Sequence, residues 1–419
     1  MPTPERGKDI RRVRLFGRGE FFTGAALAGV VLVGLILFGI HRSKVICRDK
    51  LIRSGFPESY AEQLVGLQLE HRGWQFVPLR IDDLPWDRIV DRECAPGWNL
   101  VNFSKWAPDA WGRLGTANYT PYYAENAKAY DSGAWYQASR AAVAYFMDPR
   151  NFFDENGIFM FESLGYNESA QGRAAVEQTL SGTFMANAAV DGGPRKFPEL
   201  ILETGRKLGI SPVFLAARLA SEQGNGSPQA FGTIGDLLID LYTNGTTQIG
   251  KAVVWGKTFA KDGKNTAAVV AAGREKYNGH YNLFNIGAYG SGVFEIKYNA
   301  WREAVSEETC AKYCGPWTSQ ERALRGGAVR IKEKYIDTHR YTRYFQKFSV
   351  VPEAGAFRWK QYMQNIAAPL VESRNTCKAY DAVGALDAPY RFVIPVYVGM
   401  PERPCPDPAN GKSVYSTAK

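Results

Sequence analysis

Histidine is scarce in this sequence, and closely spaced cysteines are almost absent from it. Among the 419 residues are four histidines, scattered along the chain, and six cysteines, of which only Cys310 and Cys314 stand close together. A structural zinc site usually draws its ligands from two such close pairs. The sequence therefore argues against zinc, and we expect neither a metal nor another cofactor.

Internal repeats and low-complexity tracts are also missing, which excludes a module built from repeats. Hydrophobic residues make up 45% of the chain and charged residues 22%, a composition typical of one large or two to three ordinary globular domains. The aromatic content of 13% argues against disorder and suits contact with carbohydrate. The net charge of +9 implies an anionic partner surface, which nucleic acid, anionic lipid and anionic wall polymers would all provide.

Charge is absent from Phe21 to Ile40. At 1.5 Å per residue a helix of this length spans about 30 Å, the thickness of a bilayer core. We predict a basic cytoplasmic tail at residues 1–20 and a transmembrane helix at residues 21–41. A cleaved signal peptide is the alternative, but the run is longer than a usual signal core and no small-residue cleavage motif follows it.

Basic residues stand on both sides of this run, so the positive-inside asymmetry is weak. We expect a single-pass protein of the cytoplasmic membrane with everything after the helix outside the cytoplasm. The cysteines all follow the run, as disulfides in an oxidising compartment require. We therefore expect disulfides among Cys47, Cys94, Cys310, Cys314, Cys377 and Cys405.

The stretch from Ser211 to Gly224 predicts a short helix with a carboxylate near its end. Ser211 is a suitable N-cap, and Pro212 suits the first helical position, where the missing N–H costs nothing. Apolar residues recur at helical spacing, and Gly224 offers a left-handed stop. Glu222 therefore lies in the last turn, beside a glycine-rich loop.

The end of a helix is an unusual place for an acidic residue. The helix C-terminus carries partial negative charge, which disfavours a carboxylate there. A carboxylic acid that keeps its proton near neutral pH is what glycoside cleavage uses as a general acid. The alternative is that Glu222 is an ordinary solvated surface residue.

The stretch from Tyr281 to Tyr289 combines aromatic residues with two amides and a glycine. Aromatic rings stack on sugar faces, while Asn282 and Asn285 can bind hydroxyl or acetamido groups. A buried turn with internally bonded asparagines is an equally good interpretation of this stretch alone.

Together, the Ser-Glu-Gln-Gly around Glu222 and the Tyr-Asn-Leu-Phe-Asn-Ile-Gly from Tyr281 resemble the bacterial endo-β-N-acetylglucosaminidases of glycoside hydrolase family 73, in particular their membrane-anchored branch. The resemblance implies a mainly α (α+β) fold, with a lysozyme-like glucosaminidase domain after an N-terminal helical module. It implies cleavage of the β-1,4 bond after N-acetylglucosamine in peptidoglycan glycan strands, with Glu222 as general acid. The substrate-binding residues would be Tyr281, Asn282, Phe284, Asn285 and Tyr289.

Apart from an insert, the resemblance returns along residues 51–405, including Asp148-Pro-Arg-Asn151, Gln361–Ile366 and a tail at Tyr390–Pro401 whose alternating pattern predicts a strand. We interpret Arg150 as architectural, paired with carboxylates at a domain junction. The predicted units are a non-catalytic module at 42–190, a glucosaminidase domain at 191–405 with an insert at 233–276, and a flexible tail at 406–419. The catalytic domain should open with a helix at 197–208, ended by Gly209.

The second catalytic group is not evident. Asp236, Asp240, Glu275 and Glu295 are candidates, and assistance by the substrate's acetamido group would need none of them. Two other functions stay open: a lytic transglycosylase, which also runs on one glutamate, and an inactive glycan-binding or scaffold protein. A membrane-protein partner is compatible with all three, whereas we expect no nucleic acid partner.

Overall fold

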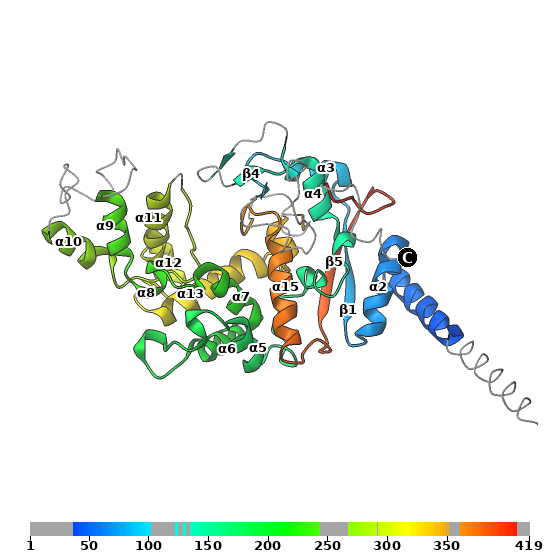
Figure 1. Ribbon diagram of the computed structural model, residues 1–419, viewed down its shortest axis with the longest axis horizontal. Coiled ribbons are helices and arrows are strands. Elements are labelled where there is room, and N and C mark those ends of the chain that lie inside the picture. The colour runs from blue at the N-terminus through cyan, green and yellow to red at the C-terminus, as the bar shows by residue number, and fades with distance from the viewer. Residues whose placement is uncertain are drawn as a thin grey trace, which may run out of the picture.

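The computed structural model describes residues 37–101, 122–124, 129–130, 135–243, 267–290, 292–348, 350–351 and 361–408. In these residues the fold is mainly helical, as predicted, and it also contains two small sheets (Figure 1). The helices of the first half are α2 (Glu58–Glu70), α3 (Trp86–Glu93), α4 (Arg140–Met147), α5 (Arg173–Thr179), α6 (Phe197–Leu208) and α7 (Pro212–Gln223). Those of the second half are α8 (Pro228–Phe231), α9 (Ile234–Thr243), α10 (Ala267–Tyr277), α11 (Val293–Ala304), α12 (Glu307–Lys312), α13 (Gln320–Ile331), α14 (Arg343–Lys347) and α15 (Ala368–Asp381).

Shorter helical turns connect several of these elements. They are the 3₁₀ helices η4 (Pro149–Phe152), η5 (Ile158–Phe161), η6 (Phe184–Ala186) and η7 (Val190–Gly192), and the π-helical turn η8 (Lys332–Ile336) that follows α13. The helix α6 has the predicted bounds, and Gly209 ends it in the left-handed conformation at φ 69°. A glycine adopts this conformation without the steric cost that a Cβ would bring.

One sheet joins segments that are more than 300 residues apart in the sequence. The strand β1 (Gln75–Ile81) pairs in parallel with β5 (Arg391–Tyr397), with Gln75 opposite Arg391 and Ile81 opposite Tyr397. The predicted C-terminal strand is thus present, but its residues are buried on both faces rather than alternately. The other sheet has the order β2 (Leu100–Val101), β4 (Trp135–Gln137), β3 (Ala129–Tyr130).

Aromatic side chains fill the core around this parallel pair. The ring of Trp74 lies 4.9 Å from that of Phe392 and 5.6 Å from that of Phe159. The indole nitrogen of Trp74 donates to the carbonyl of Leu386 at 2.7 Å. One core therefore receives residues from both ends of the chain, and the predicted boundary between residues 190 and 191 stays a prediction.

The Asp-Pro-Arg-Asn motif is architectural, as predicted. Buried Arg150 pairs with Asp148 at 2.8 Å and donates to the backbone carbonyls of Glu402 and Arg403, both at 3.1 Å. A guanidinium that binds a carboxylate on one side and two carbonyls on the other fixes both segments. Arg150 thus fastens the C-terminal segment to the first half of the chain.

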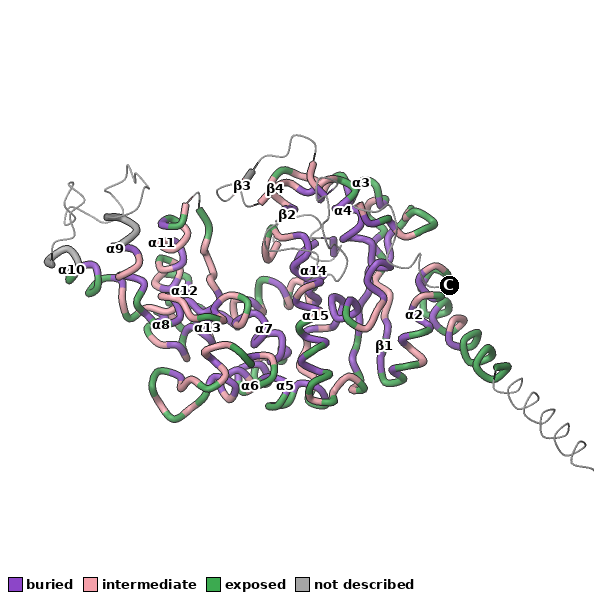
Figure 2. Tube along the Cα trace, viewed as in Figure 1, coloured by how far each residue is buried: buried purple, intermediate pink, exposed green. Residues whose placement is uncertain are grey.

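The predicted transmembrane helix lies mostly outside the described residues, which begin at 37. Residues 37–53 are helical, and Figure 2 shows most of the first part of this helix exposed, projecting from the body of the protein. In the portion of the chain that is described, no helix combines the length and apolarity needed to cross a membrane. The span at residues 21–41 remains a prediction.

The predicted disulfides are absent: all six cysteines, each within a described segment, are free thiols. Burial raises the pKa of Cys94 to about 11 and the pKa values of Cys377 and Cys405 to about 12. Disulfide formation proceeds through the thiolate, which these surroundings disfavour. Cys310 and Cys314 are exposed but are likewise unbonded.

Candidate active site

The helix α7 delivers Glu222 to the centre of the protein. Its N-cap is Ser211, whose hydroxyl accepts from the amide of Phe214 at 3.1 Å, and Pro212 is its first residue, as predicted. Residues 212–219 are buried all round the helix, and Glu222 in the last turn is partly exposed. One detail of the prediction is wrong: Gly224 keeps right-handed helical angles, and the left-handed turn falls at Gly226 with φ 80°.

Two neutral donors hold the carboxylate of Glu222. The hydroxyl of Tyr362 donates to Oε1 at 2.7 Å, and the side-chain amide of Asn285 donates to Oε2 at 2.8 Å. Burial and the charge of Glu222 raise the pKa of Tyr362 well above its ordinary value, although nearby Arg218 opposes this. Tyr362 therefore remains a phenol, able to donate or accept.

A second layer of hydrogen bonds fixes the orientation of Asn285. The side-chain amide of Gln223 donates to Asn285 Oδ1 at 3.1 Å, and the hydroxyl of Ser227 donates to Gln223 Oε1. Because the Asn285 nitrogen can only donate, it occupies a lone pair of Glu222 Oε2, whereas the Tyr362 hydroxyl can turn from donor to acceptor. Glu222 can thus carry a proton on Oε1 and keep both contacts.

Glu222 lies in a groove of about 930 Å³. Of the predicted site residues, the structure brings Glu222, Phe284, Asn285 and Tyr289 together in its lining. Phe284 is buried, whereas Tyr289 is 62% exposed. Among the described residues, the lining is Arg218, Glu222, Phe284–Gly290, Ile296, Glu303, Arg330, Ile331, Lys334, Tyr335 and Gln361–Gln364.

Two predicted site residues, Tyr281 and Asn282, are not in the lining. Asn282 is buried, and its amide donates to the carbonyls of Ile286 and Ala300, both at 2.8 Å, while Oδ1 accepts from the amide of Ile286 at 3.0 Å. These bonds occupy its polar atoms and hold the loop that carries Asn285. The structure gives Asn282 a supporting position, and contact of either residue with substrate stays a prediction.

The four candidates for a second carboxylate do not meet Glu222 in the groove. Asp236 forms an ion pair with Arg274 at 2.5 Å, and Glu275 and Glu295 are exposed outside the lining. The side chain of Asp240 lies outside the described part of the chain.

A different carboxylate, that of Glu303, lines the groove, which sequence reasoning missed. Glu303 is ion-paired with Arg330 and accepts from the hydroxyl of Thr309 at 3.1 Å. Its charge is therefore matched by a cation, whereas Glu222 receives neutral donors.

The wall that carries Tyr362 is attached to the first half of the chain. The amide of Leu100 donates to the carbonyl of Gln364 at 2.8 Å, and the amide of Ile366 donates to the carbonyl of Leu100 at 3.1 Å. The side chain of Gln364 donates to the carbonyl of Gly97 at 2.6 Å. Residues of the predicted non-catalytic module thus hold the wall beside Glu222.

Sequence reasoning assigned no role to Tyr362, Arg218 or Arg330. The similarity of Gln361–Ile366 to the family was the signal available for Tyr362, because it marked the segment without indicating what the segment touches. Arg218 and Arg330 left no comparable signal, since each is a single charged residue in a helical pattern.

A buried lysine beneath this wall makes the stability of the protein depend on pH. Lys347 donates to the carbonyl of Trp98 at 3.1 Å, and burial lowers its pKa to about 7, against the opposing charge of Glu93. Between pH 10 and 7 the unfolded chain takes up this proton while the folded protein does not. The free energy of unfolding should therefore fall with falling pH in that window, by at most about 1.4 kcal/mol per pH unit, and level off below it.

Urea denaturation of the wild type and of Lys347→Met at pH 7, 8 and 9 measures this contribution. The difference between the two proteins should change with pH, whereas exposed Lys207→Met should run parallel to the wild type. Parallel curves for Lys347→Met would show that Lys347 is protonated throughout.

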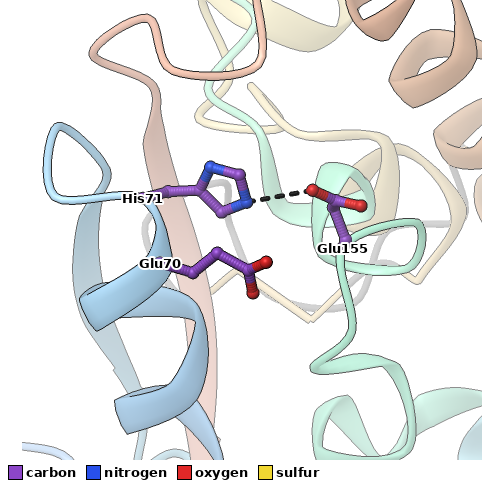
Figure 3. Close-up of side chains that lie close together, drawn as sticks. All are labelled: Glu70, His71 and Glu155. Carbon is purple, nitrogen blue, oxygen red and sulfur yellow. Dashed lines mark hydrogen bonds and ion pairs between the residues drawn. The ribbon is translucent and has the colours of Figure 1, made fainter.

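In the described residues, one group of side chains could hold a metal: Glu70, His71 and Glu155, whose ligand atoms lie within 4.8 Å of one another (Figure 3). The ring of His71 lies 3.0 Å from Glu155 through Nε2 and 3.1 Å from Asp387 through Nδ1. Both ring nitrogens thus have carboxylate partners without an ion. None of these residues lines the groove.

Comparison with known proteins gives structural matches alone. No protein-family model and no curated protein sequence matches the chain. The crystal structure of Major Bifunctional Autolysin is 15% identical, covers 77% of this chain and 99% of its own, and has a TM-score of 0.40. S. aureus glucosaminidase B is also 15% identical, covers 77% of this chain and 93% of its own, and has a TM-score of 0.40. A catalytic mutant of S. aureus Autolysin E in complex with the disaccharide NAG-NAM is 15% identical, covers 72% of this chain and 93% of its own, and has a TM-score of 0.38. Likeness of this degree identifies neither the family nor the activity of the chain.

Proposed function

We propose that this protein is a peptidoglycan hydrolase that cleaves the β-1,4 bond after N-acetylglucosamine in glycan strands, with Glu222 as general acid. The observation that carries the proposal is the position of Glu222, partly exposed in a groove of about 930 Å³ and held by Tyr362 and Asn285. A groove of this size has room for more than one sugar ring, since pockets of about 300–1,000 Å³ hold drug-sized ligands.

The lining of the groove suits an amino sugar. Tyr289 offers an exposed ring, the largely buried rings of Phe284 and Tyr335 lie in the lining, and Gln361 and Gln364 offer amides. Rings stack on pyranose faces, and amides bind hydroxyl and acetamido groups. The sequence resemblance to glycoside hydrolase family 73 supports the same substrate.

The second carboxylate in the lining, Glu303, is neutralised by Arg330, which supports chemistry that runs on Glu222 alone. Glu222 would give its proton to the leaving glycosidic oxygen. The acetamido group of the substrate or a water molecule would complete the displacement at the anomeric carbon. A lytic transglycosylase also runs on one glutamate and is the second candidate, with an anhydro end in place of the reducing end.

We also propose that residues 21–41 anchor the protein in the cytoplasmic membrane, with the groove on the outer side. Support comes from the uncharged run and from the exposed apolar residues Leu37, Phe38, Ile40 and Ile46 on the helix at residues 37–53. Apolar side chains exposed in this way avoid water when they enter a bilayer or its interface. Full rescue of cell morphology by a chain that lacks residues 1–45 would contradict a requirement for this anchor.

Digestion of purified peptidoglycan by the full-length protein in detergent tests the activity. We expect products that end in reducible N-acetylglucosamine, identified by mass after borohydride reduction. Products that end in anhydro-muramic acid, one water lighter and resistant to reduction, would establish the transglycosylase instead. Binding of peptidoglycan without release of fragments would favour the glycan-binding or scaffold function.

A further inference from the structure

We propose that Arg218 is a positioning residue that holds the ring of Tyr362 in place and thereby orients Glu222. The proposal rests on the proposed function for its activity assay, but the contacts that carry it are independent of the substrate.

Arg218 lies on α7 four residues before Glu222, so both side chains are on the same face of the helix. It is 1% exposed and yet lines the groove. Its guanidinium carbon lies 4.9 Å from the centroid of the Phe214 ring and also lies over the face of the Tyr362 ring. A cation on the face of a desolvated ring is attracted by the ring's quadrupole.

The hydrogen bonds of Arg218 among the described residues are incomplete. Nη2 donates to Gln346 Oε1 at 2.8 Å, whereas Nε and Nη1 have no hydrogen-bond partner in the part of the chain that the structure describes. The carboxylate of Glu372 lies 3.9 Å from Nη2, too far for a hydrogen bond. A buried guanidinium with two unpaired N–H groups is costly, so burying it here for packing alone would be unfavourable.

Gln346 links Arg218 to Tyr362 through two hydrogen bonds. Its side chain accepts from Arg218, and its backbone carbonyl accepts from the amide of Tyr362 at 2.9 Å. Tyr362 is thus fixed at its backbone by Gln346 and at its ring by Arg218, and its hydroxyl then meets Glu222 Oε1 at 2.7 Å. Arg218 acts on Glu222 through Tyr362.

A double-mutant cycle tests this route. Tyr362→Phe keeps the ring and removes the hydroxyl that reaches Glu222. If Arg218 acts by placing that hydroxyl, Arg218→Met should lower kcat on peptidoglycan about tenfold with KM within about twofold, because small misplacements of reacting groups lower the rate by such factors. In the Tyr362→Phe background, Arg218→Met should then lower kcat little further. Arg218→Lys, which keeps the charge, should recover part of the loss.

Arg325 offers a control. It is partly buried on α13, pairs with Glu203 and Glu321, both at 2.8 Å, and has no contact with Tyr362 among those resolved for the described residues. The effects of Arg325→Met and Tyr362→Phe on kcat should multiply, as for independent sites. Multiplying effects for Arg218→Met would overturn the proposal.

A second measurement separates failure of this inference from failure of the proposed function. If the wild type releases no product, the proposed function is wrong, and the contact between Arg218 and Tyr362 is tested by urea denaturation of Arg218→Met, Tyr362→Leu and the double variant. Tyr362→Leu removes the ring. If the ring and the Arg218 guanidinium stabilise each other, the shift of the urea midpoint in the double variant should differ from the sum of the shifts in the two single variants. Additive midpoints would show that the ring and the guanidinium do not support each other.

Discussion

Glu222→Gln is expected to abolish measurable release of fragments from peptidoglycan, with kcat lowered by about 10²–10⁴, the usual contribution of a general acid. Glutamine has the shape of glutamic acid but no proton to give to the leaving oxygen. It also fits the hydrogen bonds: its oxygen can accept from Asn285, and its amide can donate to the Tyr362 oxygen. The loss should therefore appear in kcat while the fold and the binding of glycan persist.

The measurement is the rate of new reducing ends, with thermal unfolding as the test of folding. Glu177→Gln is a matched control, since Glu177 is an exposed helical glutamate that pairs with Arg173 on α5. It should retain the activity of the wild type. Activity of Glu222→Gln above a tenth of the wild type would remove Glu222 as the acid.

Features of the site that depend on neighbouring residues were predictable from the sequence. Ser211 and Pro212 define the start of α7 through backbone geometry within a single turn, and Gly209 ends α6 in the same local manner. Capping of this kind depends little on the rest of the fold. The end of α7 was predicted only in part, because the helix ends at Gln223 but the left-handed turn falls at Gly226 and not at Gly224.

Features that depend on distant segments were not predictable. The strand β5 was expected, but its pairing with β1 and its burial on both faces depend on distant segments, such as η5, that no spacing rule connects to it. Tyr362 reaches Glu222 across 140 positions. The local patterns of a single sequence do not identify such long-range contacts, because many arrangements of the same helices satisfy the same local preferences.

The two asparagines of the Tyr281–Tyr289 stretch show the limit most clearly. Both suit a sugar site by chemistry, yet Asn282 turns inward to bond Ile286 and Ala300, whereas Asn285 reaches Glu222. The left-handed backbone at Asn285, φ 49°, turns its side chain toward α7. The residue type was informative, and the backbone conformation decided which asparagine meets the carboxylate.

Asn285→Ala should lower kcat by about 10²-fold, the cost of a misplaced reacting group. Glu222 Oε2 loses its donor and Gln223 loses the acceptor at Oδ1, so the carboxyl group is held by Tyr362 alone. Alanine also carries the left-handed strain, about 1–2 kcal/mol, that asparagine tolerates better. Rates on peptidoglycan and unfolding in urea should therefore both decline.

Asn285→Gly separates the two causes, because glycine adopts φ 49° without strain but has no amide. Its stability should exceed that of Asn285→Ala while its kcat stays equally low. Full activity of Asn285→Gly would show that position 285 serves the loop alone, and the contact with Glu222 would then have no part in catalysis.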